Sequence, residues 1–152
     1  METRCHVVRT REEAQVLGMA LATLFPDPCC AELGLQELLY NAIEHGNLEI
    51  GGTLKAQLLR EHRFEAEIER RLDLPRYADR RVRASVSGTS AAFEVRIEDD
   101  GAGFDWRSIV GRPLEATPAL CGRGIALTLP SCLPGLEYID PGNVVILRFR
   151  CP

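Results

Sequence analysis

Hydrophobic and polar residues alternate with different periods along the chain, and each change of period marks a new element. Apolar residues recur at helical spacing from Ala14 to Phe25 and again over about 27–46. Thr10 followed by Glu13 has the spacing of a capping box, which predicts where the first helix begins. A period of two predicts strands over about 4–9, 82–87, 92–98, 136–139 and 144–149. These elements predict an α+β fold, a two-layer α/β sandwich in which helices cover one face of a mixed sheet.

A stretch rich in arginine and glutamate, at about 51–81, separates the second helical segment from the strands that follow. Glu67 and Arg71 have the i,i+4 spacing of a helical ion pair. The apolar residues of the stretch fall on one face if it is a helix: Leu54, Leu58, Ile68 and Leu72, with Phe64 on the flank. We interpret it as a helical insertion in a single domain spanning 1–152. It either covers an edge of the fold as a solvated helix or forms a docking surface for a partner.

Composition narrows the class of protein. The chain has 152 residues, 45% of them hydrophobic, which is enough for one substantial core. A formal net charge of -4 argues against a protein that binds nucleic acid through general electrostatics. No apolar stretch has membrane-spanning length and the first residues lack a signal region, so we expect a cytoplasmic protein without membrane contact. The six cysteines lack the spacing of a metal site, and we expect them to be reduced and structural.

The segment 35–47 predicts an amphipathic helix with a chemically distinctive polar side. Its apolar residues Leu35, Leu38, Leu39, Ala42 and Ile43 gather on one side. Glu37, Asn41 and Glu44 gather on the other side, facing away from the core. On its own, this pattern is typical of an ordinary solvated helix face.

Two glycine-rich stretches follow. The first, 97–104, is a strand that ends in an acidic turn containing Asp99, Gly101 and Gly103, and the second, 122–127, is a glycine-rich loop that opens an apolar segment. Each stretch alone is typical of an ordinary turn or helix start. Together with the preceding helix, and in this order, they resemble the N box and the first and second glycine boxes of the histidine-kinase-like ATPase superfamily. The run Glu37-x-x-x-Asn41-Ala42-x-x-His45-Gly46 is most similar to the small anti-sigma-factor serine kinases.

The resemblance implies a Bergerat ATP-binding fold that binds ATP and Mg²⁺. It implies that Asn41 holds the Mg²⁺ and that Glu37 polarises the hydroxyl group that attacks the terminal phosphate. It implies that Asp99 accepts a hydrogen bond from the adenine amino group, while Gly101 and Gly103 let the backbone pass close to the base. Asp100 is interpreted as a solvated turn residue.

The second glycine box implies the phosphate contacts. Backbone N–H groups at Gly122 and Gly124 would point at phosphate oxygens, and Arg123 would add a charge-assisted contact. We expect the stretch 105–121 to form a lid over the nucleotide, and His45 to be a structural residue at a helix end. This sequence departs from the family after Gly142, where Asn143 and Val144 stand in place of the usual threonines.

The function implied by the resemblance is an ATP-dependent serine/threonine protein kinase. Its substrate would be a Ser or Thr of an antagonist (anti-anti-sigma) protein, and a sigma factor and a second copy of the chain are further partners that the resemblance allows. Two alternatives stay open. One is a non-catalytic partner-switching module that binds nucleotide or only protein, and the other is the ATP-binding part of a larger signalling protein.

Overall fold

The computed structural model describes residues 3–108, 133 and 135–151. In chain order the elements are β1 (Arg4–Val8), α1 (Arg11–Ala22), α2 (Pro28–Asn41), the π-helix η1 (Ala42–Asn47), α3 (Gly52–Arg60), α4 (Phe64–Leu72), β2 (Val82–Gly88), β3 (Ala92–Glu98), the short 3-10 helix η2 (Trp106–Ser108), β4 (Leu136–Ile139) and β5 (Val144–Arg150). All five strands lie where the alternating pattern predicts them. Among the described residues, no helix is long and apolar enough to cross a membrane.

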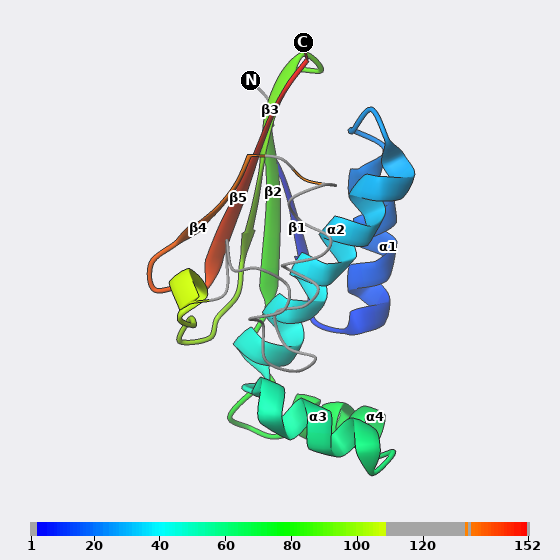
Figure 1. Ribbon diagram of the computed structural model, residues 1–152, viewed down its shortest axis with the longest axis vertical. Helices are drawn as coiled ribbons and strands as arrows, with labels where there is room; N and C mark the ends of the chain where they lie inside the picture. The colour runs from blue at the N-terminus through cyan, green and yellow to red at the C-terminus, as the bar shows by residue number, and fades with distance from the viewer. Residues whose placement is uncertain (1–2, 109–132, 134, 152) are drawn as a thin grey trace.

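The five strands form one sheet in the order β1-β2-β3-β5-β4, and α1 and α2 cover one of its faces (Figure 1). Every described strand pair is antiparallel. The expected α+β class with helices on one face is confirmed, but the expectation of a mixed sheet is wrong. The β2–β3 and β4–β5 pairs are hairpins, whose short loops allow only antiparallel neighbours.

The core lies between the sheet and the two helices. Val95 and Ile97 on the central strand β3 alternate inward, as does Ala84 on β2, and all three are at most 1% exposed. On the helical side, Leu35 and Leu39 of α2 have no exposed surface. The apolar face predicted for α2 is therefore the face that packs on the sheet.

Local signals set the helix starts. Thr10 and Glu13 form the predicted capping box, since the Thr10 side chain accepts a hydrogen bond from Glu13 N and the Glu13 carboxylate accepts one from Thr10 N. Asp27 caps α2 by accepting from Cys30 N at 3.1 Å, and Pro28 occupies the first turn, where its missing N–H costs nothing.

The second helical segment changes character before it ends. From Ala42 to Asn47 the backbone is a π-helix, a feature that the helical period does not predict. Glu44 lies in this segment and is only 2% exposed. The expectation that Glu44 faces away from the core with Glu37 and Asn41 is therefore wrong. The wider π turn and the covering insertion bury this carboxylate, which pairs with cations from α1 and α3.

The insertion is helical as predicted, but it consists of two helices, α3 and α4, at one end of the molecule (Figure 1). The chain reverses direction at His62, which adopts a positive φ of 54°. Because this break contains no glycine or proline, the sequence does not indicate it. Phe64, expected on the flank, is buried at 5% exposure. The predicted ion pair is confirmed, with Arg71 Nε 2.7 Å from Glu67 Oε1.

The cysteines differ in state. Cys5, Cys29 and Cys151 are free thiols, whereas Cys30 is disulfide-bonded. The expectation that all six cysteines are reduced is therefore wrong for Cys30.

Candidate nucleotide-binding site

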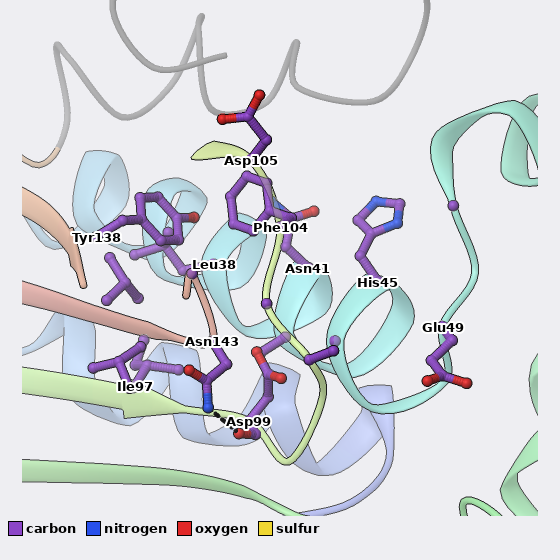
Figure 2. A pocket seen from close by; sticks show the side chains of 18 of the residues that line it. Leu38, Asn41, His45, Glu49, Ile97, Asp99, Phe104, Asp105, Tyr138 and Asn143 are labelled. Carbon is purple, nitrogen blue, oxygen red and sulfur yellow. Dashed lines mark hydrogen bonds between the residues drawn. The ribbon is translucent and has the colours of Figure 1, made fainter. Parts of the chain in front are cut away.

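A cavity of about 480 Å³ opens between the α2–η1 helix and the ends of the central strands (Figure 2). The helix contributes one wall, the segment after β3 a second, and the β4–β5 hairpin a third. The first residues of α3 close one side. Its lining includes Leu38, Asn41, Ala42, His45, Gly46, Gly51, Gly52, Ile97, Asp99, Gly103, Phe104, Tyr138, Gly142 and Asn143. The segments 35–47 and 97–104, which the sequence singled out separately, thus share one cavity.

Asp99 is the buried carboxyl group of this cavity. It follows the last residue of β3 and is 7% exposed. Its Oδ1 accepts a hydrogen bond from Gly101 N at 2.8 Å, and Oδ2 accepts none from the described residues. Burial raises the pKa of Asp99 to about 7, against a smaller lowering by the Gly101 hydrogen bond. A donor placed in the cavity would therefore compensate a carboxylate that the protein itself leaves poorly solvated.

Close backbone contacts hold Asp99 in place. A Cβ at Gly46 would overlap the Asp99 carboxylate, and a Cβ at Gly101 would overlap the Gly46 carbonyl oxygen. Gly103 has a φ of +84° and lies against the Pro141 carbonyl. Gly101 and Gly103 therefore pack the acidic turn against the helix and the β4–β5 turn. Of these two, only Gly103 lines the cavity.

Asn41 and Glu37 lie one turn apart on α2, but they differ in access to the cavity. The Asn41 side chain lines it, and an amide oxygen there can serve as one of the oxygen ligands that Mg²⁺ prefers alongside phosphates and water. Glu37 is half-buried and is not among the lining residues. Burial raises the pKa of Glu37, Lys55 lowers it and Glu44 raises it.

His45 lines the cavity one turn after Asn41 (Figure 2). Its Nδ1 contacts the Ile50 carbonyl oxygen, which ties the end of η1 to the segment leading into α3. Burial lowers the pKa of His45, so the ring is neutral at physiological pH. These contacts agree with the structural role expected for this residue.

Asn143 and the aromatic residues complete the far wall. Asn143 Nδ2 donates to the Asp99 carbonyl oxygen at 3.1 Å, and Asp99 N donates to the Asn143 carbonyl oxygen at 2.9 Å. The ring of Phe104 packs edge-on against that of Tyr138, with centroids 5.1 Å apart. Asn143 thus braces Asp99, a task that the sequence did not assign to it.

Sequence reasoning missed some of these residues and named others that the structure does not describe. The sequence analysis names Gly46 only as part of a motif, although its missing side chain makes room for Asp99. A glycine within a helical pattern is the sequence feature that could have indicated this close approach. Phe104 and Tyr138 gave no signal beyond their apolar character. Asp100 is exposed as expected, with Arg83 Nη1 2.7 Å from its carboxylate. Gly122, Arg123 and Gly124, together with most of the expected lid, lie outside the described residues.

Neither a scan against protein-family models nor a search of curated proteins finds a match to this chain.

Proposed function

We propose that this chain binds ATP with Mg²⁺ and transfers the terminal phosphoryl group to a Ser or Thr of a partner protein. The observation that carries the proposal is the shared cavity of Asn41 and Asp99. These residues come from distant parts of the sequence and match the metal and adenine positions of the histidine-kinase-like ATPases, whose Bergerat fold we propose for this domain. A cavity of about 480 Å³ is in the range of small-molecule sites.

Asp99 would give the site its preference for adenine. The adenine amino group can donate a hydrogen bond to the Asp99 carboxylate, whereas guanine presents a carbonyl oxygen at the corresponding position and would be repelled. Because burial raises the pKa of Asp99 to about 7, the carboxyl is partly protonated at neutral pH. A donor amino group would favour the ionised form.

The partner is proposed from the resemblance to the anti-sigma-factor kinases. We propose an antagonist (anti-anti-sigma) protein as the phosphate acceptor, with Glu37 accepting the proton of its hydroxyl group. A sigma factor and a second copy of this chain would be further partners in such a switch. The proposed setting is the cytoplasm, without nucleic acid or membrane as a partner.

A second candidate function is a nucleotide-binding module that regulates a partner without catalysis. It is favoured by the position of Glu37, which does not line the described cavity. In this case, nucleotide occupancy alone would control partner binding. Retained phosphoryl transfer in a Glu37→Gln variant would remove Glu37 as base, and absence of transfer in the wild type with a bound partner would favour this second function.

Calorimetric titration with ATP, ADP and GTP, with and without Mg²⁺, tests the proposed site. We expect ATP to bind more tightly than GTP. A charge-assisted hydrogen bond contributes about 1.5–3 kcal/mol, so Asp99→Asn should weaken ATP binding about ten-fold or more. Asn41→Ala should still bind ATP but lose the tightening caused by Mg²⁺.

Asp100→Asn is the matched control, because the neighbouring carboxylate is exposed and pairs with Arg83 rather than lining the cavity. It should bind ATP like the wild type. Equal affinity for ATP and GTP, or equal losses in the two aspartate variants, would contradict the assignment of Asp99.

A further inference from the structure

The insertion places a lysine beside the α2–η1 helix. Lys55 lies in the first turn of α3, three residues after Gly52, which lines the cavity together with Gly51. Its Nζ lies 2.6 Å from Oε2 of the buried Glu44. The face of the Phe64 ring, 5.1 Å from Nζ to the centroid, packs on the same ammonium group. The lysine is therefore held at one place by groups from η1 and α4.

The position of Lys55 relative to the cavity follows from its 2.6 Å contact with Glu44, the residue directly before His45 in η1. Glu37, Asn41 and His45 follow one another at intervals of four residues along α2 and η1, and Asn41 and His45 line the cavity. Lys55 lowers the pKa of both Glu37 and His45, which lie on either side of Asn41. Because Glu44 lies three residues after Asn41, the ammonium group that it binds lies beside the section of helix that carries Asn41, although Lys55 itself does not line the cavity.

The nucleotide would run toward this section. Gly46, at the end of η1, touches Asp99, which marks the proposed adenine end of the cavity. Asn41 lies more than one turn earlier and marks the proposed metal end. The phosphates would thus extend from Asp99 toward Asn41.

Glu44 has a second cation, which leaves Lys55 able to exchange partners. Arg11 Nη1 from α1 lies 3.4 Å from Glu44 Oε1, and Arg11 also packs on the Phe64 ring at 5.4 Å. A buried carboxylate needs at least one such partner. If Lys55 turned toward a phosphate, Arg11 would still compensate Glu44. The lysine side chain is flexible and presents a compact point charge, which suits such an exchange.

We propose that Lys55 contacts the terminal phosphate of the bound nucleotide, so that the helical insertion supplies a phosphate-binding residue to the site. This inference rests on the proposed ATP site. It gives α3 a role that neither a solvated edge helix nor a docking surface would have. It also predicts which nucleotide the residue distinguishes, because ADP lacks the phosphate that Lys55 would reach.

Calorimetric titration of Lys55→Met with ATP·Mg²⁺ and ADP·Mg²⁺ tests the proposal. ATP affinity should fall about ten-fold or more, as expected for loss of a charge-assisted contact, while ADP affinity changes less than about two-fold. Lys55→Arg should restore part of the preference for ATP. Arg60→Met, which removes an exposed cation from the same helix, should leave both affinities unchanged.

A second variant separates binding from folding. Lys55→Met leaves Glu44 with fewer partners and destabilises the fold if Arg11 does not suffice. The double variant Glu44→Met/Lys55→Met removes both charges from the buried cluster and should still lose the preference for ATP. Equal losses for ATP and ADP, or an unchanged preference in both variants, would show that Lys55 only anchors the insertion. If the wild type bound neither nucleotide, the proposed function would fall, and this inference with it.

Discussion

At the scale of single residues, the cavity contains the carboxyl group of Asp99, whose burial is energetically unfavourable, and glycine residues that leave room for it. Asp99 is buried, accepts one described backbone hydrogen bond and has no cation paired with its carboxylate among the described residues. Arg80 only weakly lowers its pKa. A protein selected for stability alone would avoid such a group. Its retention beside a cavity is typical of a binding site.

The raised pKa of Asp99 has a consequence for stability. The folded-state pKa of about 7 lies above the reference value of 3.8, so the folded state binds this proton more tightly than the unfolded state. The stabilising contribution is fully present below about pH 3.8 and is lost as pH rises through about 7. Asp99→Asn, without ligand, should therefore raise the free energy of unfolding at pH 8 by about 1–3 kcal/mol.

Urea denaturation of wild type and Asp99→Asn at pH 8 and at the lowest pH where both stay folded checks this prediction. The difference between the two proteins should shrink as pH falls. A variant that is less stable than the wild type at pH 8 would mean that the Asp99 carboxylate is well compensated without ligand. The same variant should lose ATP affinity, so stability and binding are expected to move in opposite directions.

At the scale of elements, the π-helix η1 joins α2 to the acidic turn. Its Gly46 contacts Asp99 and Gly101, and Asn47 Oδ1 accepts a hydrogen bond from Asp100 N at 2.7 Å. The buried Asn47 Nδ2 has no hydrogen-bond partner among the described residues. Such an unsatisfied donor is a cost that a simpler helix end would avoid. Despite this cost, the π turn lies where it joins the helical wall of the cavity to the wall formed by the acidic turn.

Gly46→Ala tests this contact. The added methyl group would overlap the Asp99 carboxylate, so the helix and the acidic turn must separate. Overpacking of this kind typically costs about 1–3 kcal/mol in the free energy of unfolding. ATP affinity should fall as well, because Asp99 moves.

Gly51→Ala is the matched control. Gly51 has an ordinary φ of -68°, and nothing lies within 4 Å of the added methyl group. Thermal or urea denaturation should therefore show little change for this variant. A Gly46→Ala protein as stable as Gly51→Ala would show that the helix and the turn are not in firm contact.

At the scale of the whole molecule, arginine side chains connect the insertion (51–81) to the rest of the domain through hydrogen bonds. Arg71 of α4 donates through Nη1 to the carbonyl oxygens of Leu48 and Glu49, at 2.8 and 3.1 Å. Glu49 has a positive φ of 55°, so this is a strained turn whose carbonyl groups need donors. Arg9 likewise donates to the Leu72 and Ala78 carbonyl oxygens.

Replacing Arg71 should lower the free energy of unfolding, whereas replacing the adjacent Arg70 should change it little. Arg71→Met leaves two part-buried carbonyl groups without their donor and should lower the free energy of unfolding by about 1–3 kcal/mol. Arg70→Met removes only an exposed pair with Glu67, and its effect should stay within about 0.5 kcal/mol. Chemical denaturation of both variants gives the comparison. Similar effects for the two would mean that the Leu48–Glu49 turn does not depend on Arg71.

Much of the fold follows from local rules that act within a few residues. The strands lie where the period of two predicts them, and Thr10, Glu13 and Asp27 cap helices as their spacing indicates. The segment 35–47 buries its apolar face as expected. These features depend on side-chain spacing and backbone hydrogen bonding nearby, so they can be read from the sequence.

The candidate site was predicted only in part. Their motifs indicate Asn41 and Asp99 as site residues, and both line the cavity. A motif also indicates Glu37, but Glu37 is not among the described residues that line the cavity. The burial of Glu44 and the position of Lys55 were not foreseen, because they depend on how α3 and α4 pack against α1 and η1.

The strands, the helix starts, the apolar face of α2 and the residue types available for chemistry follow from the amino-acid sequence alone. The antiparallel order of the sheet, the π turn, the break at His62 and the contact between Gly46 and Asp99 depend on how the chain packs. The physical reason is the range of the interactions. Periodicity and capping act along the chain, whereas burial, and the charge state that burial sets, depend on residues that only folding brings together.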